Sequence, residues 1–157
     1  MMNEEEAIQK LKERFGDKIV EAKIIGKRRV SVRVPPDAYK EIVKYVAQDL
    51  GLEFLSCLSG IDRGKSLEVV AHVGYSLCIL VRAEVPKDSP EIDSITDILP
   101  AANLYEREAH DLLGINFRGH PNLKRIFLPE DWPEGVYPLR KEYSPEHPKP
   151  LREVKDR

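Results

Sequence analysis

The amino-acid sequence predicts an α+β protein, with a small mixed or antiparallel sheet of about five strands packed with helices and followed by a long extended C-terminal tail. Apolar alternation indicates strands in groups of two and three, unlike the regular strand–helix alternation of α/β proteins. A segment with helical periodicity lies between these groups. Seven of the twelve prolines lie after residue 113, where no window is periodic. We therefore expect a compact domain at 1–113 and a partner-binding tail at 114–157.

The predicted elements follow the order α-β-β-α-β-β-β-α. They lie at 4–15, 18–25, 28–34, 35–50, 52–59, 66–73, 76–84 and 101–113, with a helical turn at 94–99. Asn3 is a typical N-cap for the first helix, and Gly16 is a typical stop. Gly51 and Gly114 end the later helices in the same way.

Two strands show where the core should lie. Alternate residues from Leu67 to Val73 are apolar and form one face of their strand. The next strand, at 76–84, is apolar on both faces until Arg82, which is typical of a strand that neighbours cover on both sides. We therefore expect this strand near the centre of the sheet.

Composition excludes several classes of protein. The longest mostly apolar run, 73–81, is far shorter than the roughly 20 residues of a membrane-spanning helix, and the acidic N-terminus differs from a signal peptide. Cys57 and Cys78 cannot form a disulfide framework. The net charge of −2 offers no general attraction for nucleic acids or anionic lipids. We expect a cytoplasmic protein that binds no nucleic acid and reaches a membrane only through a partner.

One acidic residue falls on the apolar side of the helix at 101–113. On a helical wheel, Leu104 and Tyr105 belong to the apolar arc, and Glu108 lies within that arc. A buried carboxylate is costly unless it is paired and hydrogen-bonded. Glu108 therefore either borders the core and reaches water, or pairs with a cation of the tail such as Arg125 or Arg140.

The outer side of the same helix carries Glu106, Arg107, His110 and Asp111. Arg107 and Asp111 are four residues apart and can form a surface ion pair. Glu106, His110 and Asp111, together with His120, also supply ligand types for a metal, so a stand-alone metal-dependent enzyme is the alternative hypothesis. No second Glu-x-x-His or His-x-x-x-His unit accompanies them. In its Gly-His-Pro turn, His120 is more typical of a histidine that holds backbone groups.

The tail has the composition of an ordered segment that binds a partner. Disordered segments are poor in aromatic residues, yet the tail holds five of the eleven aromatics of the chain. Prolines reduce the entropic cost of fixing an extended path. Tryptophan, tyrosine and arginine are preferred anchors of protein interfaces. We expect Arg125, Trp132, Tyr137 and Arg140 to contact another protein.

Three segments around the end of the last helix form dense motifs: EREAHDLLGINF at 106–117, GHPNLKRI at 119–126 and PLRKEY at 138–143. Together they resemble the signature of the respiratory-chain NADH dehydrogenase 30 kDa subunit family, a family of complex I subunits. The departures are mild: His110 stands where tyrosine is common, Lys124 where arginine is common, and Glu142 where aspartate is usual. The motif and expected interface residues are Glu106, Arg107, Glu108, Asp111, Gly114, Phe117, His120, Pro121, Arg125, Trp132, Tyr137, Pro138, Leu139, Arg140 and Lys141.

The resemblance implies a role without chemistry of its own. Members of the family carry no redox cofactor, and the iron–sulfur clusters of their complexes lie in other subunits. They pack on a large, hydrogenase-like subunit, which is related to the large subunit of nickel–iron hydrogenases, and on neighbouring iron–sulfur subunits. We therefore expect no catalytic, cofactor-binding or metal-binding residue in this chain.

The same resemblance implies a scaffold subunit in the hydrophilic arm of a membrane-attached, ion-translocating oxidoreductase. Two kinds of complex fit: a complex I-like NADH or F420H2:quinone oxidoreductase, and an energy-converting membrane-bound hydrogenase. The chain would then lie at the cytoplasmic side of the cell membrane as a peripheral subunit. The electron donor, the acceptor and the identity of the translocated ion, H⁺ or Na⁺, stay open, because a scaffold subunit does not carry the substrate site.

Overall fold

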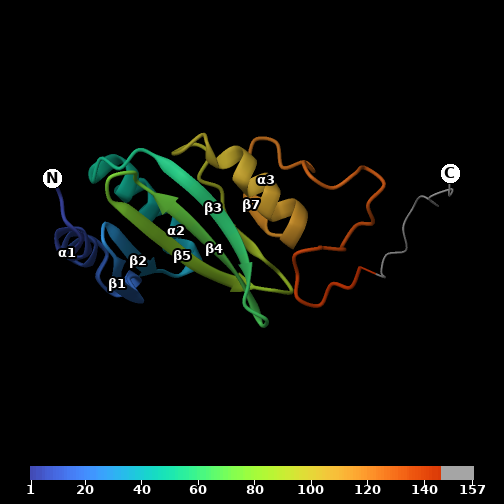
Figure 1. Ribbon diagram of the computed structural model, residues 1–157, viewed down its shortest axis with the longest axis horizontal. Helices are drawn as coiled ribbons and strands as arrows, with labels where there is room; N and C mark the ends of the chain where they lie inside the picture. Colours follow the sequence, from blue (N-terminus) through green and yellow to red (C-terminus); the bar gives the residue numbers. More distant parts are fainter. Residues whose placement is uncertain (146–157) are drawn as a thin grey trace.

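The structure is a computed structural model that describes residues 1–145 (Figure 1). Its helices are α1 (Glu4–Phe15), α2 (Pro36–Lys44) and α3 (Ala102–Leu113), with a 3₁₀ turn at Gly16–Lys18 and a π-helical turn at Tyr45–Asp49. Its strands are β1 (Glu21–Gly26), β2 (Arg29–Arg33), β3 (Leu55–Asp62), β4 (Ser66–Val73), β5 (Cys78–Pro86), β6 (Glu91–Asp93) and β7 (Asn116–Arg118). The order of helices and strands confirms the predicted α+β class.

The first five strands form one mixed sheet in the order β1-β2-β5-β4-β3. Neighbouring strands are antiparallel except β2 and β5, which are parallel. The helix α2 lies behind the strands in the view of Figure 1. After β2 the chain passes through α2, β3 and β4, and β5 then pairs with β2 in parallel. The position of β5 in the middle of the sheet confirms the prediction from its apolar pattern.

The core lies between one face of the sheet and the helices. The alternate residues of β4 from Leu67 to Val73 are completely buried, as their pattern predicted. From α1, Leu11 is completely buried and Phe15 nearly so. The α3 helix packs on β3, where a Cβ added to Gly60 would lie 2.5 Å from Cδ1 of Leu113. A glycine in β3 thus lets α3 approach the sheet closely.

The ends of α1 and α3 lie where the sequence predicted them, whereas α2 ends at Lys44 and continues to Asp49 as a π-helical turn. Asn3 and Glu6 form a reciprocal capping box at the start of α1, and Gly16 caps its end. Gly114 adopts the left-handed conformation at the end of α3. The strands β1, β3 and β5 start two or three residues later than predicted, while β4 starts where it was predicted. In β1 the cause is a 3₁₀ turn at residues 16–18.

One structural feature was missed by the sequence analysis. The strands β6 and β7 pair in parallel as a separate two-stranded sheet. Each has only three residues, which is too short to produce a recognisable alternation. Ile115 and Phe117, which follow the predicted boundary at residue 113, are buried with the core. The division into 1–113 and 114–157 stays a prediction, and residues 146–157 lie outside the described part of the chain.

Candidate docking site

The residues predicted to bind a partner gather around α3 and the segment that follows β7. Residues 119–145, named the strap below, lie beside α3 at one end of the molecule (Figure 1). The guanidinium of Arg107 donates to the backbone carbonyl of Lys124 at 3.0 Å and to that of Arg125 at 2.9 Å. Arg107 therefore holds the strap along the helix.

Asp111 holds the next part of the strap. Its Oδ2 accepts hydrogen bonds from the consecutive backbone N–H groups of Ile126, Phe127 and Leu128, at 3.1, 2.8 and 2.9 Å. Burial raises the pKa of the Asp111 carboxyl, but these bonds and the nearby charge of Arg125 outweigh it, so the pKa lies below its ordinary value. The predicted surface ion pair with Arg107 is wrong, because the Asp111 side chain is buried and bonds backbone groups instead.

Arg125 closes the same loop from the other side. Its Nη1 donates to the carbonyl oxygens of Pro129, Glu130 and Trp132, at 2.9, 3.3 and 2.6 Å. The indole N–H of Trp132 then donates to the carbonyl of Val136 at 2.8 Å. One guanidinium nitrogen thus contacts three carbonyl oxygens of an irregular backbone, and its charge makes these hydrogen bonds stronger than neutral ones.

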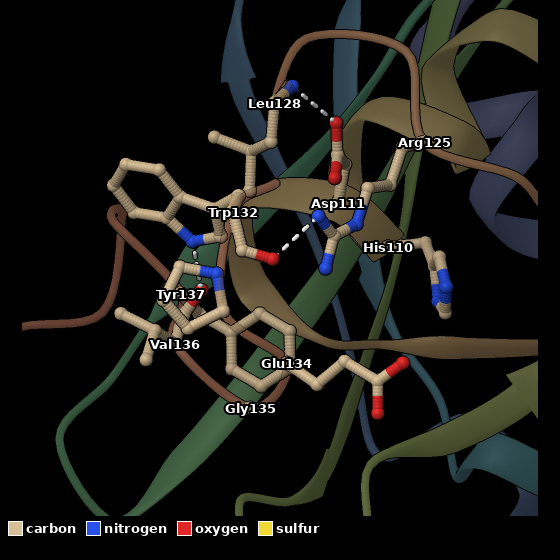
Figure 2. A pocket seen from close by; sticks show the side chains of 10 residues that line it. His110, Asp111, Arg125, Leu128, Trp132, Glu134, Gly135, Val136 and Tyr137 are labelled. Atoms are coloured by element: carbon tan, nitrogen blue, oxygen red, sulfur yellow. Dashed lines mark hydrogen bonds between the residues drawn. The ribbon is translucent and has the colours of Figure 1, made fainter. Parts of the chain in front are cut away.

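Figure 2 shows the hollow that these contacts enclose. Its volume is about 320 Å³, and it is lined by His110, Asp111, Arg125, Leu128 and residues 132–137. The imidazole Nδ1 of His110 forms a hydrogen bond with the carbonyl of Ile115 at 2.9 Å. Most of the polar side chains at the hollow therefore bond to the protein's own backbone, and their arrangement serves to shape the strap.

The strap also closes the C-terminal end of α3. Gly114 has a φ of +79°, and a Cβ at this position would lie 2.5 Å from the ring of Tyr137. The guanidinium of Arg140 lies over the same ring, 4.6 Å from its centroid. The Nε of Arg140 donates to the carbonyl of Leu113 at 2.8 Å. A cation thereby meets the negative end of the helix and satisfies one of its last carbonyls.

Pro138 and Leu139 continue this contact. The backbone N–H of Leu139 donates to the carbonyl of Leu112 at 3.1 Å, so a second terminal carbonyl of α3 has a partner in the strap. Pro138 is half-buried. The side chain of Leu139, in contrast, is 56% exposed. Backbone contacts therefore order this segment, while the Leu139 side chain stays available to a partner.

A further attachment joins the strap to the end of the sheet. Asp62 at the end of β3 accepts hydrogen bonds from the backbone N–H of Lys141 at 2.8 Å and from Lys87 Nζ at 2.7 Å. Lys87 also bonds Glu142 at 2.6 Å. Burial raises the pKa of the Asp62 carboxyl, but the bonds from Lys87, Lys141 and Gly64 outweigh it and hold the pKa well below its usual range.

A second buried carboxylate of α3 is Glu106, which the sequence analysis placed on the outer side. Glu106 is completely buried. Its oxygens accept hydrogen bonds from Ser94 Oγ at 2.7 Å and from the backbone N–H of Ile95 at 2.8 Å. Burial raises the pKa of Glu106 to about 7, although these two bonds oppose the shift. The segment before α3 therefore supplies the partners of this buried carboxylate.

Glu108 takes the less demanding of its two predicted environments. It is half-buried and lines a hollow next to Leu139. Arg125 and Arg140, the two expected partners, bond to backbone carbonyls instead. Leu104, which the wheel placed in the apolar arc, is 58% exposed. A single arc fails here because α3 contacts β3, the segment before it and the strap on different sides.

His120, Pro121 and Phe117 have structural surroundings. His120 Nδ1 accepts the backbone N–H of Asn122, and Nε2 donates to the carbonyl of Asn103, both at 3.0 Å. This confirms the interpretation of His120 as a turn histidine that holds backbone groups. Pro121 is exposed in this turn, and Phe117 is buried in β7.

The metal-site hypothesis finds no grouped ligands in the structure. Glu106, His110, Asp111 and His120 each form hydrogen bonds with a different part of the backbone. Within residues 1–145, no set of three or more His, Cys, Asp or Glu side chains is placed to hold a metal ion. The residues therefore lack the shared centre that a metal needs.

Sequence reasoning missed three residues that complete the site. Asp62 and Lys87 lie far from the motifs in sequence, and only the fold brings them to Lys141. Ser94 reaches Glu106 across a gap of twelve residues. The hint for Asp62 was its position next to Arg63-Gly64, where an aspartate commonly accepts a turn N–H. Such a signal indicates a turn and carries no information about the strap.

A comparison with protein families shows which family the chain belongs to. The family model described as "Respiratory-chain NADH dehydrogenase, 30 Kd subunit" matches residues 32–149. The chain belongs to this family. The match includes α3, its motif and the described strap, so the family region contains the contacts set out above.

Curated relatives of this chain belong to several multi-subunit oxidoreductases. It is 37% identical to a subunit of the F(420)H(2) dehydrogenase of Methanosarcina mazei, with 87% of this chain and 89% of the relative covered. It is 35% identical to the beta subunit of the membrane-bound hydrogenase of Pyrococcus furiosus, with 89% and 86% covered. Identity to a subunit of the NADH-quinone oxidoreductase of Chloroherpeton thalassium is 34%, over 89% of this chain but 60% of that relative.

Solved structures of related complexes share the fold. A chain of the membrane-bound sulfane sulfur reductase, an archaeal respiratory membrane complex, superposes with a TM-score of 0.78 at 26% identity, covering 89% of this chain and 85% of that one. The trypsin-resistant fragment of Nqo5 superposes with a TM-score of 0.63 at 28% identity, covering 74% and 98%. Residues 1–145 of this chain contain no helix long and apolar enough to cross a membrane.

Proposed function

We propose that this chain is a non-catalytic docking subunit in the hydrophilic arm of a membrane-attached, ion-translocating oxidoreductase. Its partner is the large, hydrogenase-like subunit, with iron–sulfur subunits beside it. Family membership and the relatives in respiratory and hydrogenase complexes support a place in such an assembly. The chain lies at the cytoplasmic side of the membrane and contacts the lipid only through the complex.

The observation that carries this proposal is the construction of the strap. Asp111, Arg125 and Arg140 bind backbone groups and fix an irregular path. The same segment leaves Phe127 and Leu139 more than half exposed. A chain that fixes a loop by polar contacts while exposing apolar side chains has the form of a preformed protein-binding surface. The predicted interface residues among Glu106–Lys141 thus divide into those that shape the strap and those that face outward.

The chemistry of the complex resides in other subunits under this proposal. The iron–sulfur clusters and the substrate sites for electron donor and acceptor lie outside this chain. The relatives named for F420H2, hydrogen and NADH chemistry support a subunit that is compatible with more than one donor or acceptor. The contribution of this chain is then to position the large subunit relative to its neighbours.

Co-expression with the large subunit tests the proposal. We expect the full-length chain to co-purify with the large subunit in a defined stoichiometry, and membranes that lack this chain to lose electron transfer. The purified chain alone should contain no iron, nickel or flavin by elemental and absorbance analysis, and should not oxidise NADH, F420H2 or hydrogen. A redox cofactor bound tightly to the isolated chain, or full activity of the complex without it, would overturn the proposal.

A chain shortened after Gly119 provides a second arm of this experiment. It retains the buried Ile115 and Phe117 but lacks the strap. We expect that the shortened chain no longer co-purifies with the large subunit. Circular dichroism on the shortened chain reports whether the sheet has folded. Leu139→Glu in the full-length chain is a second variant: it changes an exposed side chain of the strap and leaves the backbone contacts of the strap in place.

A further inference from the structure

Three consecutive residues of the strap turn their backbone N–H groups toward one carboxylate, and two of them expose their side chains. The N–H groups of Ile126, Phe127 and Leu128 converge on one carboxylate oxygen of Asp111. Leu128 is half-buried and lines the hollow, whereas Phe127 is 61% exposed and Ile126 is 37% exposed. The loop therefore presents a large aromatic side chain to the outside.

This presentation is rigid. The backbone before Phe127 is held by Arg107, and the backbone after it is held by Arg125. Apolar side chains in a free loop would fold inward and reduce their exposed area, because burial of apolar surface is favourable. Fixing the loop in advance removes part of the conformational entropy that binding would otherwise cost. Such an exposed and ordered aromatic residue has the properties of an interface hot spot.

The other exposed aromatic residues have a different setting. Phe54 and Tyr75 are 53% and 87% exposed, but they pack against each other at 5.9 Å with their rings nearly perpendicular. That edge-to-face contact covers part of the apolar surface of both rings. Among residues 1–145, Phe127 is not part of any such aromatic pair. Phe54 therefore serves as a matched phenylalanine with similar exposure at another site.

Charge indicates the chemistry of the surface that would receive Phe127. Glu130, Asp131 and Glu134 follow it within seven residues and are all exposed. Arg125 is half-buried and bonds backbone carbonyls, and the exposed Lys124 precedes Phe127 by three residues. The exposed charges of the segment that follows Phe127 are therefore acidic. A partner surface with basic side chains around an apolar depression would match both features.

We infer that residues 125–134 form a docking loop in which Phe127 inserts into an apolar pocket of the large subunit, and that lysine or arginine side chains at the rim of that pocket face Glu130 and Asp131. The inference rests on the proposed function, because it takes the large subunit as the partner. Asp111 acts as a positioning residue that holds the loop in its binding conformation.

Affinity measurements with the purified large subunit test this inference. We expect Phe127→Ala to raise the dissociation constant at least tenfold, and Phe54→Ala to change it less than twofold. Both variants should melt within one or two degrees of the wild type, since both side chains are exposed. The double substitution Glu130→Gln with Asp131→Asn should slow association and weaken its dependence on salt concentration.

The outcomes separate the two levels of the argument. If the wild-type chain does not bind the large subunit, the proposed function fails and this inference fails with it. If the wild type binds and Phe127→Ala binds equally well, only the docking loop is overturned. Equal losses in Phe127→Ala and Phe54→Ala would also overturn it, because they would show a general sensitivity of the surface. An unchanged salt dependence in the Glu130 and Asp131 variant would refute the basic rim.

Discussion

The five-stranded sheet and the strap are held in place by different kinds of contact. In the sheet, residues such as Leu67 and Val81 are completely buried among apolar neighbours. In the strap, Asp111 and Arg125 bind main-chain groups, and the side chain of Phe127 faces outward. The sheet therefore depends on apolar area removed from water, whereas the strap depends on a few charge-assisted hydrogen bonds.

This difference determines how damage should spread. Apolar contacts in a core are shared among many residues, so their loss weakens the whole cooperative unit. The strap contacts converge on single atoms, such as Asp111 Oδ2. Removal of one such atom should release a local segment while the sheet stays folded. A strap substitution that unfolds the sheet, or a core substitution that acts only locally, would refute this difference between the sheet and the strap.

The largest effect is expected from Leu67→Ala, near the start of β4. Leu67 is completely buried, and removal of its side chain leaves a cavity, so unfolding free energy should fall by about 3 kcal/mol. Leu104→Ala is the matched control, because Leu104 is 58% exposed and should cost less than about 0.5 kcal/mol. Urea unfolding followed by circular dichroism measures both. Equal losses in the two variants would contradict the assignment of the core.

Asp111→Ala should produce the next largest effect, and a local one. It leaves three backbone N–H groups without their acceptor, which should cost about 2 to 3 kcal/mol unless the loop opens to water. We expect the amides of 126–128 to exchange with solvent at least tenfold faster, while the amides of β4 keep their protection. The exposed Asp131→Ala is the control. Unchanged exchange at 126–128 would show that Asp111 does not hold the loop.

The sheet was largely predictable from sequence, and its polar contacts were not. The apolar alternation of β4 and β5 depends on nearest neighbours along one strand, so it is visible in the sequence and it placed β5 correctly. Helix ends were predictable for a similar reason, since Asn3 and Gly114 act within one turn. Contacts such as Asp62 with Lys141 join residues far apart in the chain and leave no periodic signal.

The helix α3 shows where periodicity itself misled. A wheel assumes one buried side, but α3 is covered by β3, by the segment at Ser94 and by the strap. Glu106 and Asp111 were therefore placed outside although both are buried. The motif resemblance indicated that these residues matter, and the fold was needed to show that each binds a different part of the backbone.

The burial of Glu106 predicts that the free energy of unfolding falls by about 2 to 3 kcal/mol between about pH 5 and pH 8. Its pKa is raised from the ordinary 4.5 to about 7, so the folded chain binds more protons than the unfolded chain between these values. The contribution of Glu106 is therefore present below about pH 4.5 and is lost as pH rises through about 7. We expect unfolding free energy to fall between about pH 5 and pH 8.

Glu106→Gln separates this effect from other titrating groups. Glutamine keeps the shape of the side chain but does not titrate, so the variant should lose the decline between about pH 5 and pH 8. His72 opposes the trend in both proteins, because burial lowers its pKa and its contribution grows with rising pH. Subtracting the pH curve of Glu106→Gln from that of the wild type removes the contribution of His72, which is the same in both proteins. A wild-type curve parallel to the Glu106→Gln curve would refute the raised pKa.

The smallest effect concerns the contact between the end of α3 and the strap. Gly114 and Gly119 have nearly equal φ angles of +79° and +80°, so alanine meets similar backbone strain at both. Only at Gly114 would the new Cβ meet a neighbour, the Tyr137 ring at 2.5 Å. Gly114→Ala should therefore cost about 1 kcal/mol more than Gly119→Ala, measured by urea unfolding. In a Tyr137→Ala background this excess should disappear, because the ring that the Cβ displaces is gone. An excess that persists there would assign the cost of Gly114→Ala to the helix end alone and would remove Tyr137 from the contact that joins the sheet domain to the strap.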